Sequence, residues 1–232
     1  MNKRKNNADS HNLRSLVLLG DSITEHWLGT GLGYESKKAI GIPEVLEDKF
    51  QSSFDPVVLA ISGDQTQHLL YRMMNGQLPS VNDEDAIFVV MIGTNNLGSG
   101  ELPGPSAKGV LAVADYILSN TKGVLLLFQV LPRGDGFRIL PMICPPRCSS
   151  TGEPFKSFIP AVNKLNEAVK NRVEGLRELY GKNRLVLMDC GSNFIEKIKN
   201  DSSEVNIALM PDLLHPNAEG HEILADCILQ NV

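Results

Sequence analysis

The sequence predicts a single α/β domain, a three-layer sandwich in which five parallel strands lie between two layers of helices. Three observations support this prediction. Short apolar runs alternate along the chain with longer amphipathic ones, as in repeated βα units. The apolar runs are nearly continuous, which is typical of strands covered by helices on both faces. The chain has 232 residues, of which 42% are hydrophobic and 21% charged, and this suits one domain with a full core.

Five strands are expected where short apolar runs are bounded by polar or turn-forming residues. They are Ser15–Gly20, Pro56–Ala60, Ala86–Gly93, Gly123–Val130 and Arg184–Asp189. The segment before them, residues 1–14 (MNKRKNNADSHNLR), is basic and polar, and we interpret it as an N-terminal extension of a domain that covers residues 15–232. No internal repeat or low-complexity tract suggests a second domain.

Five helices are expected between and after these strands, because apolar residues recur there at helical spacing. They span about Pro43–Phe50, Gln65–Asn75, Ser106–Asn120, Phe158–Tyr180 and Asn217–Leu229. The last helix has the clearest start, since Pro216 and a capping-type Asn217 introduce it.

A long segment from Arg133 to Ser157 holds four prolines and several glycines, so we expect it to be mostly loop. Loops of this length in compact domains are usually functional or disordered. This one follows the fourth strand at its carboxyl end, where ligands bind in parallel α/β sheets. We therefore expect residues 133–157 to form a rim or lid over the active site.

Composition argues against several classes of function. A formal charge of -5 and a pI near 5.6 leave no broad basic field, so nucleic-acid binding is not expected. The apolar run SLVLLG is too short for a secretory signal, and no run approaches the roughly 18 apolar residues of a membrane span. We therefore expect a cytoplasmic protein without stable membrane insertion.

Cys144 and Cys148 bracket Pro145-Pro146-Arg147, a spacing that suits a small disulfide or two of the four ligands of a zinc site. The zinc interpretation lacks its second pair of ligands, so free thiols or a local disulfide are favoured. Four cysteines are too few for a disulfide scaffold in a chain of this size.

Residues 16–24 read LVLLGDSIT and place Ser22 just past the first strand, where a helix begins. Its hydroxyl would face the ligand crevice, and its N–H would lie at a helix N-terminus, which favours developing negative charge. This placement suits a nucleophile. Gly-Asp-Ser is also an ordinary turn with an N-cap, so this segment alone leaves both interpretations open.

Residues 210–221 read MPDLLHPNAEGH and place Asp212 three residues before His215. A serine hydroxyl needs a base to accept its proton, and the base needs a partner that fixes its tautomer. Asp212 and His215 can fill these roles from a single turn. The alternative is a turn aspartate beside a surface histidine, and the segment by itself does not decide between the two.

Gly63 in AISGDQT and Asn95 in MIGTNNLG each follow a predicted strand. With the Ser22 N–H, a Gly63 N–H and the Asn95 amide would supply three donors to the oxyanion of a tetrahedral intermediate. Both residues also suit ordinary turns or caps. What favours chemistry is the conjunction, because all these segments meet at one edge of the predicted sheet.

Taken together, these motifs make the sequence resemble the SGNH, or GDSL-like, hydrolase family. Its signature blocks can be read in order as Gly20-Asp21-Ser22, Gly63, Gly93-Thr94-Asn95-Asn96 and Asp212-Leu213-Leu214-His215. Within the family the chain looks most like the catalytic subunits of intracellular platelet-activating-factor acetylhydrolase and their microbial relatives, through the stretches GDQTQHLLYRM, IGTNNLG, VLPRG and LHPNAEGHEILADCI.

The resemblance implies a flavodoxin-like sandwich with strand order 2-1-3-4-5. It also implies that Ser22, Asp212 and His215 form a catalytic triad and that Ser22, Gly63 and Asn95 form the oxyanion hole. No metal or organic cofactor is implied. A homodimer stays open, because the N-terminal segment that the similar subunits use in dimer contacts is shorter here.

The expected function is a serine-dependent carboxylic-ester hydrolase that acts through an acyl-enzyme on small-molecule or lipid esters, with acetyl the expected acyl group. One alternative is a carbohydrate O-acetyl esterase with Trp27 stacking on a sugar, although core packing is favoured for that side chain. Others are a non-catalytic binding or scaffold subunit and, last, a flavin or nucleotide binder, for which the first loop lacks a phosphate cradle. We expect His221 on a helix surface and not as the base.

Overall fold

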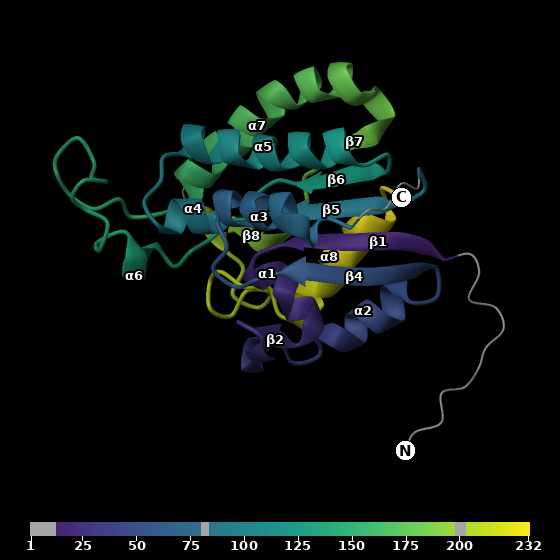
Figure 1. The fold of residues 1–232 in the computed structure, drawn as a ribbon. Coiled ribbons are helices and arrows are strands. Elements are labelled where there is room, and N and C mark those ends of the chain that lie inside the picture. Colours follow the sequence, from purple (N-terminus) through teal and green to yellow (C-terminus); the bar gives the residue numbers. More distant parts are fainter. Residues whose placement is uncertain (1–12, 80–83, 198–202) are drawn as a thin grey trace.

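A five-stranded parallel sheet runs through the centre of the molecule (Figure 1). The computed structural model describes residues 13–79, 84–197 and 203–232. The strands are β1 (Arg14–Gly20), β4 (Phe54–Ala60), β5 (Ile87–Met91), β6 (Val124–Phe128) and β7 (Leu185–Met188). They lie in the order β4-β1-β5-β6-β7, which is the expected order 2-1-3-4-5. Residues 1–12 of the expected N-terminal extension lie outside the described residues.

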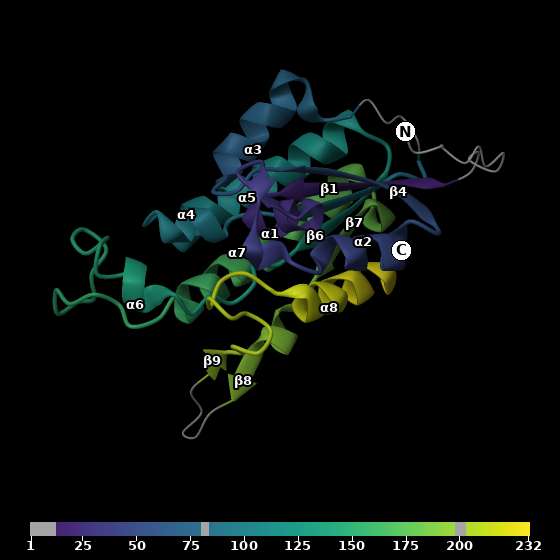
Figure 2. The ribbon, with the colours of Figure 1, turned by 90° about the horizontal axis from the view of Figure 1, so that it is seen from below.

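Helices cover both faces of the sheet (Figures 1 and 2). On one face lie α3 (Thr66–Arg72), α5 (Pro103–Asn120) and α7 (Ile159–Tyr180), and on the other lie α2 (Ile42–Phe50) and α8 (Ala218–Leu229). The middle of β1 shows why its sequence is uniformly apolar: Leu16 and Leu18 are buried in one core, and Val17 and Leu19 in the other. The expected three-layer α/β fold is confirmed.

The register of the sheet brings the ends of three strands together. Gly20, the last residue of β1, pairs with Ala60 of β4 and Met91 of β5. A Cβ at Gly20 would lie 2.3 Å from Thr24 Oγ1 and 2.4 Å from the Met91 carbonyl, so only glycine fits there. The loops after β1, β4 and β5 therefore begin side by side at one edge.

Several short elements complete the fold. The helix start at Ser22 had been expected, and the others had not been predicted, because two to five residues are too few for a periodic pattern. Two of them, β2 and β3, form a hairpin after Ser22, and the described parts of β8 and β9 pair before the last helix. These elements are α1 (Ser22–Glu25), β2 (Thr30–Gly31), β3 (Tyr34–Glu35), α4 (Thr94–Gly98), α6 (Gly136–Ile139), β8 (Ile195–Lys197) and β9 (Ser203–Val205), with 3-10 or π turns at His26–Leu28, Lys37–Ala39, Met73–Gln77, Lys182–Arg184 and Gly191–Phe194.

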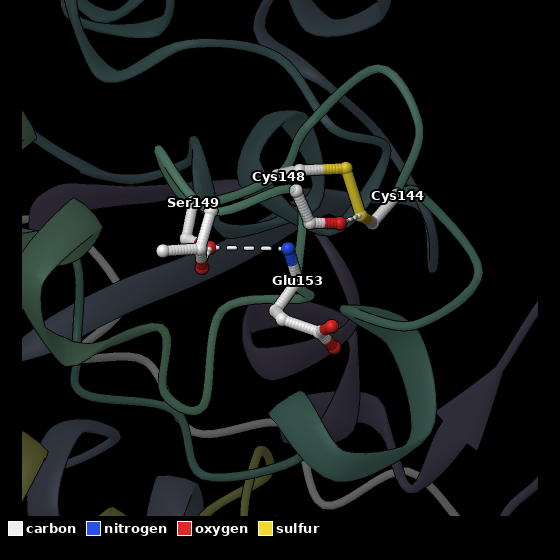
Figure 3. The surroundings of a disulfide bond; sticks show 6 residues. Cys144, Cys148, Ser149 and Glu153 are labelled. Carbon is white, nitrogen blue, oxygen red and sulfur yellow. Dashed lines mark hydrogen bonds between the residues drawn. A yellow bond between two sulfur atoms is a disulfide. The ribbon is translucent and has the colours of Figure 1, made fainter.

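Residues 133–157 are mostly irregular, as expected, and α6 is the helix within them. A disulfide joins Cys144 to Cys148, and the Glu153 N–H donates to Ser149 Oγ at 3.2 Å on the following turn (Figure 3). The pairing agrees with the expected local disulfide and leaves no thiolate there for zinc. The loop projects from the carboxyl edge of the sheet (Figure 1), and its role as a rim or lid stays a prediction.

A second disulfide, which the sequence had not indicated, joins Cys190 just after β7 to Cys227 on α8. The two cysteines are 37 residues apart. The bond therefore encloses the whole segment that carries Asp212 and His215.

Among the helices of the described ranges, none combines the length and the apolarity needed to cross a bilayer.

Candidate active site

Ser22 lies where β1 gives way to the short helix α1. Asp21 caps this helix, because its Oδ1 accepts a hydrogen bond from the Ile23 N–H at 3.1 Å. The Ser22 Oγ lies 2.9 Å from Nε2 of His215, which is 193 residues further along the chain. The structure therefore brings the expected nucleophile and base into hydrogen-bond contact.

Asp212 holds His215 through two different oxygens. Its Oδ1 accepts hydrogen bonds from the N–H groups of Leu214 (3.1 Å) and His215 (2.7 Å), which fixes the turn between them. Its Oδ2 lies 2.7 Å from the ring nitrogen Nδ1 of His215. Leu213 at the centre of this turn has a φ of 67°, an uncommon conformation for a residue with a side chain. The turn thus orients the partly buried imidazole of His215 toward Ser22.

Lys38 also contacts this aspartate, and the sequence had not indicated it. The Nζ of Lys38 lies 2.7 Å from Asp212 Oδ2, the oxygen that faces His215. Burial by itself would raise the pKa of Asp212, but hydrogen bonds from His215 and Lys38 outweigh it and hold that pKa well below its usual range. Asp212 is therefore a carboxylate throughout the range in which proteins work.

The candidate oxyanion donors lie on the loops after β1, β4 and β5. Gly63 has a φ of 87°, which favours glycine, and the contacts of the described residues include no acceptor for its N–H. Asn95, in the first turn of α4, donates one amide hydrogen to the carbonyl of Asp64 at 3.0 Å. An amide carries a second hydrogen, which stays available. The structure brings Asn95 to the Gly63 loop, and the oxyanion role of both residues stays a prediction.

Glu25 connects the short helix α1 to the Gly63 loop, and this too had not been predicted. Its buried carboxylate accepts hydrogen bonds from Ser62 N–H and Oγ (both 2.6 Å), Gly33 N–H (2.7 Å), Leu32 N–H (3.0 Å) and the Thr30 hydroxyl (3.0 Å). Burial opposes ionisation, but the hydrogen bonds from Ser62, Gly33 and Thr30 lower the pKa of Glu25 to about 2. One carboxylate thereby fixes the hairpin and the residue before Gly63.

A second buried charge, Arg133, supports α4 from the other side. Its guanidinium donates to both carboxylate oxygens of Asp135 (2.8 and 2.7 Å) and to the Thr94 carbonyl (2.6 Å). It also lies 4.4 Å from the centre of the Phe158 ring. Because Thr94 precedes Asn95, Arg133 helps to set the start of the helix that presents the Asn95 amide.

Asp21 is the other acid at the site. Its side chain is fully buried, and its Oδ2 has no hydrogen-bond partner among the described residues. Burial raises the pKa of Asp21 to about 7, although the hydrogen bond from the Ile23 N–H acts in the opposite direction. This acid lies next to Ser22 in the chain, yet its contacts are those of a cap.

Two further histidines lie near His215. The ring of His26 is buried 5.0 Å from that of His215, and burial followed by the charge of His215 lowers the pKa of His26 to about 4, so it stays neutral. The expectation of a surface position for His221 is wrong. It is fully buried, with Nε2 3.0 Å from the Ile23 carbonyl. Its spacing to buried Leu224, Ala225 and Ile228 is helical, and this signal was available in the sequence.

Trp27 is core packing, as favoured. Its ring is 3% exposed and meets the His221 ring edge to face, with centroids 4.6 Å apart. It is therefore not placed to stack on a sugar.

In the part of the chain that the structure describes, no group of three or more His, Cys, Asp or Glu side chains could hold a metal ion. What the site offers is a hydroxyl, a base and an orienting carboxylate in series, the arrangement that activates serine for attack on a carbonyl.

Comparisons with known proteins show the family to which the chain belongs. The model of the GDSL-like Lipase/Acylhydrolase family matches residues 18–223. The alpha2 subunit of platelet-activating factor acetylhydrolase IB from Gallus gallus is 33% identical over 76 residues, which cover 32% of this chain and 31% of that protein. The matched segment thus spans about a third of the relative's length.

Solved structures show the same fold at low identity. An acylhydrolase-like protein from Bacteroides fragilis has a TM-score of 0.60 at 16% identity, with 94% of this chain and 85% of that chain covered. An acetylxylan esterase from Geobacillus stearothermophilus has a TM-score of 0.59 at 17% identity, with 94% and 93% covered. Because the family model covers most of the chain, the protein belongs to the GDSL-like lipase/acylhydrolase family and is a carboxylic-ester hydrolase.

Proposed function

We propose that Ser22 attacks the carbonyl carbon of an ester and that His215 accepts its proton. The observation that carries the proposal is the 2.9 Å contact between Ser22 Oγ and His215 Nε2, with Asp212 on the other ring nitrogen. The tetrahedral intermediate collapses to an acyl-enzyme as His215 returns the proton to the leaving alcohol. Water then repeats the sequence and releases the acid.

The oxyanion of the intermediate is proposed to rest on the N–H groups of Ser22 and Gly63 and on the free amide hydrogen of Asn95. Support comes from their common position at the ends of β1, β4 and β5. Glu25 and Arg133 hold the Gly63 loop and α4 in place. Donors fixed by such contacts need little rearrangement when charge develops in the transition state.

For the substrate we propose a short-acyl ester, with acetyl first, on a lipid or other small alcohol. The Gallus gallus relative is named an acetylhydrolase, and the Geobacillus enzyme an acetylxylan esterase. The carbohydrate alternative loses its sequence argument, because Trp27 is buried in the core. Hydrolysis of an acetylated xylo-oligosaccharide faster than that of an acetylated glycerolipid would restore it.

The test of the mechanism is hydrolysis of p-nitrophenyl acetate, butyrate and octanoate by the wild type and by Ser22→Ala. We expect the acetate to be the best substrate and kcat to fall by several orders of magnitude in the variant. Labelling with a fluorophosphonate should modify the wild type at Ser22 and leave the variant unmodified. Wild-type protein that neither hydrolyses nor labels would instead support a non-catalytic binding subunit.

The cytoplasmic location stays a prediction, and the cysteines bear on it. Both described pairs are joined as disulfides, which persist mainly in oxidising compartments. Alkylation of the native protein at its source, followed by mass spectrometry, distinguishes a cytoplasmic location from an oxidising compartment. Four alkylated cysteines would support the cytoplasm, and none would place the protein in an oxidising compartment.

A further inference from the structure

A cavity of about 370 Å³ lies between the end of α4, the first turns of α5 and α7, and the 133–157 loop. Figure 2 shows α6, which belongs to this loop, beside the start of α7. Ser22, Asp212 and His215 are not among the residues that line the cavity. Its volume is within the usual range of small-molecule sites. The cavity is therefore a second candidate binding site.

The walls of this cavity are largely apolar. Leu97 of α4, Leu140 of the loop and Phe158 at the start of α7 form buried parts of the lining. Ile143 is partly buried, and Phe155 is 47% exposed. A lining that runs from buried leucines to an exposed phenylalanine suits a ligand with an apolar body that reaches solvent.

The charges around the cavity are mainly positive. Lys156 and Lys164 line it, and neither ammonium has an ion pair or hydrogen bond within the described residues. Arg147 also lines it, but its Nε already donates to the Gly100 carbonyl at 2.5 Å. The acid of the lining is Glu101, whose Oε2 accepts hydrogen bonds from Asn96 and Ser106. The two ammonium groups are thus free to bind an anion, and the Arg147 guanidinium adds a third positive charge to the lining.

Two helices add to this field. Both α5 and α7 begin at the cavity, with Pro103 and Pro160 in their first turns, and Ser157 Oγ accepts a hydrogen bond from the first N–H of α7 at 3.1 Å. The positive ends of both helix dipoles lie at the cavity. They therefore favour a bound anion, as the two lysines do. The loop wall is held in shape by the Cys144–Cys148 disulfide (Figure 3) and by the contact of Arg147 with Gly100.

We infer that this cavity binds a single-chain amphiphile with an anionic head, such as a fatty carboxylate. The aliphatic chain lies against Leu97, Leu140 and Phe158, and the carboxylate lies at Lys156 and Lys164. The inference does not depend on Ser22 acting as the nucleophile, because the cavity uses none of the triad.

The test is calorimetric titration of dodecanoate and of uncharged dodecanol into Ser22→Ala protein, in which no hydrolysis can occur. We expect both to bind. The double variant Lys156→Gln/Lys164→Gln should weaken dodecanoate about tenfold and leave dodecanol unchanged, because only the carboxylate gains from the ammonium groups. Phe155→Ala should weaken both ligands, and its exposed position makes it safe for folding.

The matched control is Lys170→Gln, a lysine further along α7 that lies outside the cavity. It should leave both affinities unchanged. No binding of dodecanoate, or equal binding by the double variant and the control, would overturn the inference. The result of the earlier Ser22→Ala hydrolysis experiment bears on the catalytic proposal alone. The catalytic proposal and the proposed binding site can therefore fail separately.

Discussion

The ammonium of Lys38 lies 2.7 Å from the same carboxylate oxygen of Asp212 that faces the imidazole of His215. A cation at this point shares one carboxylate with the imidazole. The pKa of Asp212 is held well below its usual range by the hydrogen bonds from Lys38 and His215. The other titratable groups beside it, His26 and His221, both have pKa values lowered by burial and add no charge there.

Replacing Lys38 by methionine should raise the pKa of Asp212 and move the acid limb of the kcat/KM profile to higher pH, because the hydrogen bond from Lys38 helps to keep that carboxylate ionised. The rate on the plateau should change little. Lys37→Met is the matched control, because that neighbouring lysine has no contact with Asp212. Identical acid limbs in the two variants would show that the ion pair has no effect on the ionisation of Asp212.

Asn95→Ala should lower kcat by about 10²–10³, since the amide is expected to stabilise the oxyanion more than the ground-state carbonyl. KM should change much less. The urea midpoint has to be measured beside the kinetics, because the Asn95 amide also donates to the Asp64 carbonyl. A wild-type kcat in a folded variant would remove Asn95 from the oxyanion hole.

Glu25→Gln should lower stability by about 2–3 kcal/mol, because an amide places hydrogens against donors that now face a carboxylate. The effect should depend on pH. The folded-state pKa of Glu25 is lowered to about 2, so its stabilisation is complete above the unfolded value near 4.5 and is lost as pH falls through about 2. Chemical denaturation at pH 7 and pH 2.5 measures this. The exposed Glu35→Gln is the control and should show no difference at either pH.

For Asp21 we expect the free energy of unfolding to depend on pH in the opposite direction. Its folded-state pKa is raised to about 7 from 3.8, so the folded protein binds more protons between these values and loses stability as pH rises through them. Asp21→Asn keeps an N-cap but cannot ionise. The variant should gain stability over the wild type between pH 5 and pH 8, on the order of a few kcal/mol at the upper end. Parallel unfolding curves at both pH values would argue against a strained buried carboxylate.

The two disulfides should contribute unequally to stability. Loop-closure entropy gives about 4 kcal/mol for the ring closed by Cys190 and Cys227 and about 2 kcal/mol for the short one closed by Cys144 and Cys148. Urea unfolding of the two double-alanine variants compares them directly. The larger loss of stability is expected when Cys190 and Cys227, the pair that encloses Asp212 and His215, are replaced. A reductant should have little effect on the remaining activity of that double-alanine variant.

The sheet could be predicted because each of its strands is an uninterrupted apolar run, and β1 with buried Leu16 to Leu19 is the clearest case. Ser22, Asp212 and His215 could be proposed because each stands beside the end of a recognisable element. Their mutual contact needed the folded chain. The same is true of Asn95, whose amide also bonds to the neighbouring loop.

Lys38 and Glu25 could not be predicted, because the sequence around each is that of an ordinary polar surface. Lys38 lies in the 3-10 turn Lys37–Ala39 and contacts Asp212, which lies near the other end of the chain. Glu25, at the end of α1, has partners both in the following hairpin and 37 residues away at Ser62. A buried carboxylate is recognised by the donors around it, and no local pattern encodes donors that distant loops supply.

The contact between Ser22 and His215 joins residues 193 positions apart. Contacts of such long sequence separation require most of the chain to be ordered around them. A nascent or truncated chain that ends before Asp212 holds all five strands of the central sheet, but its Ser22 has no His215 to contact. During refolding, the return of esterase activity should lag behind the return of helical circular dichroism, so hydrolysis reports the completion of folding.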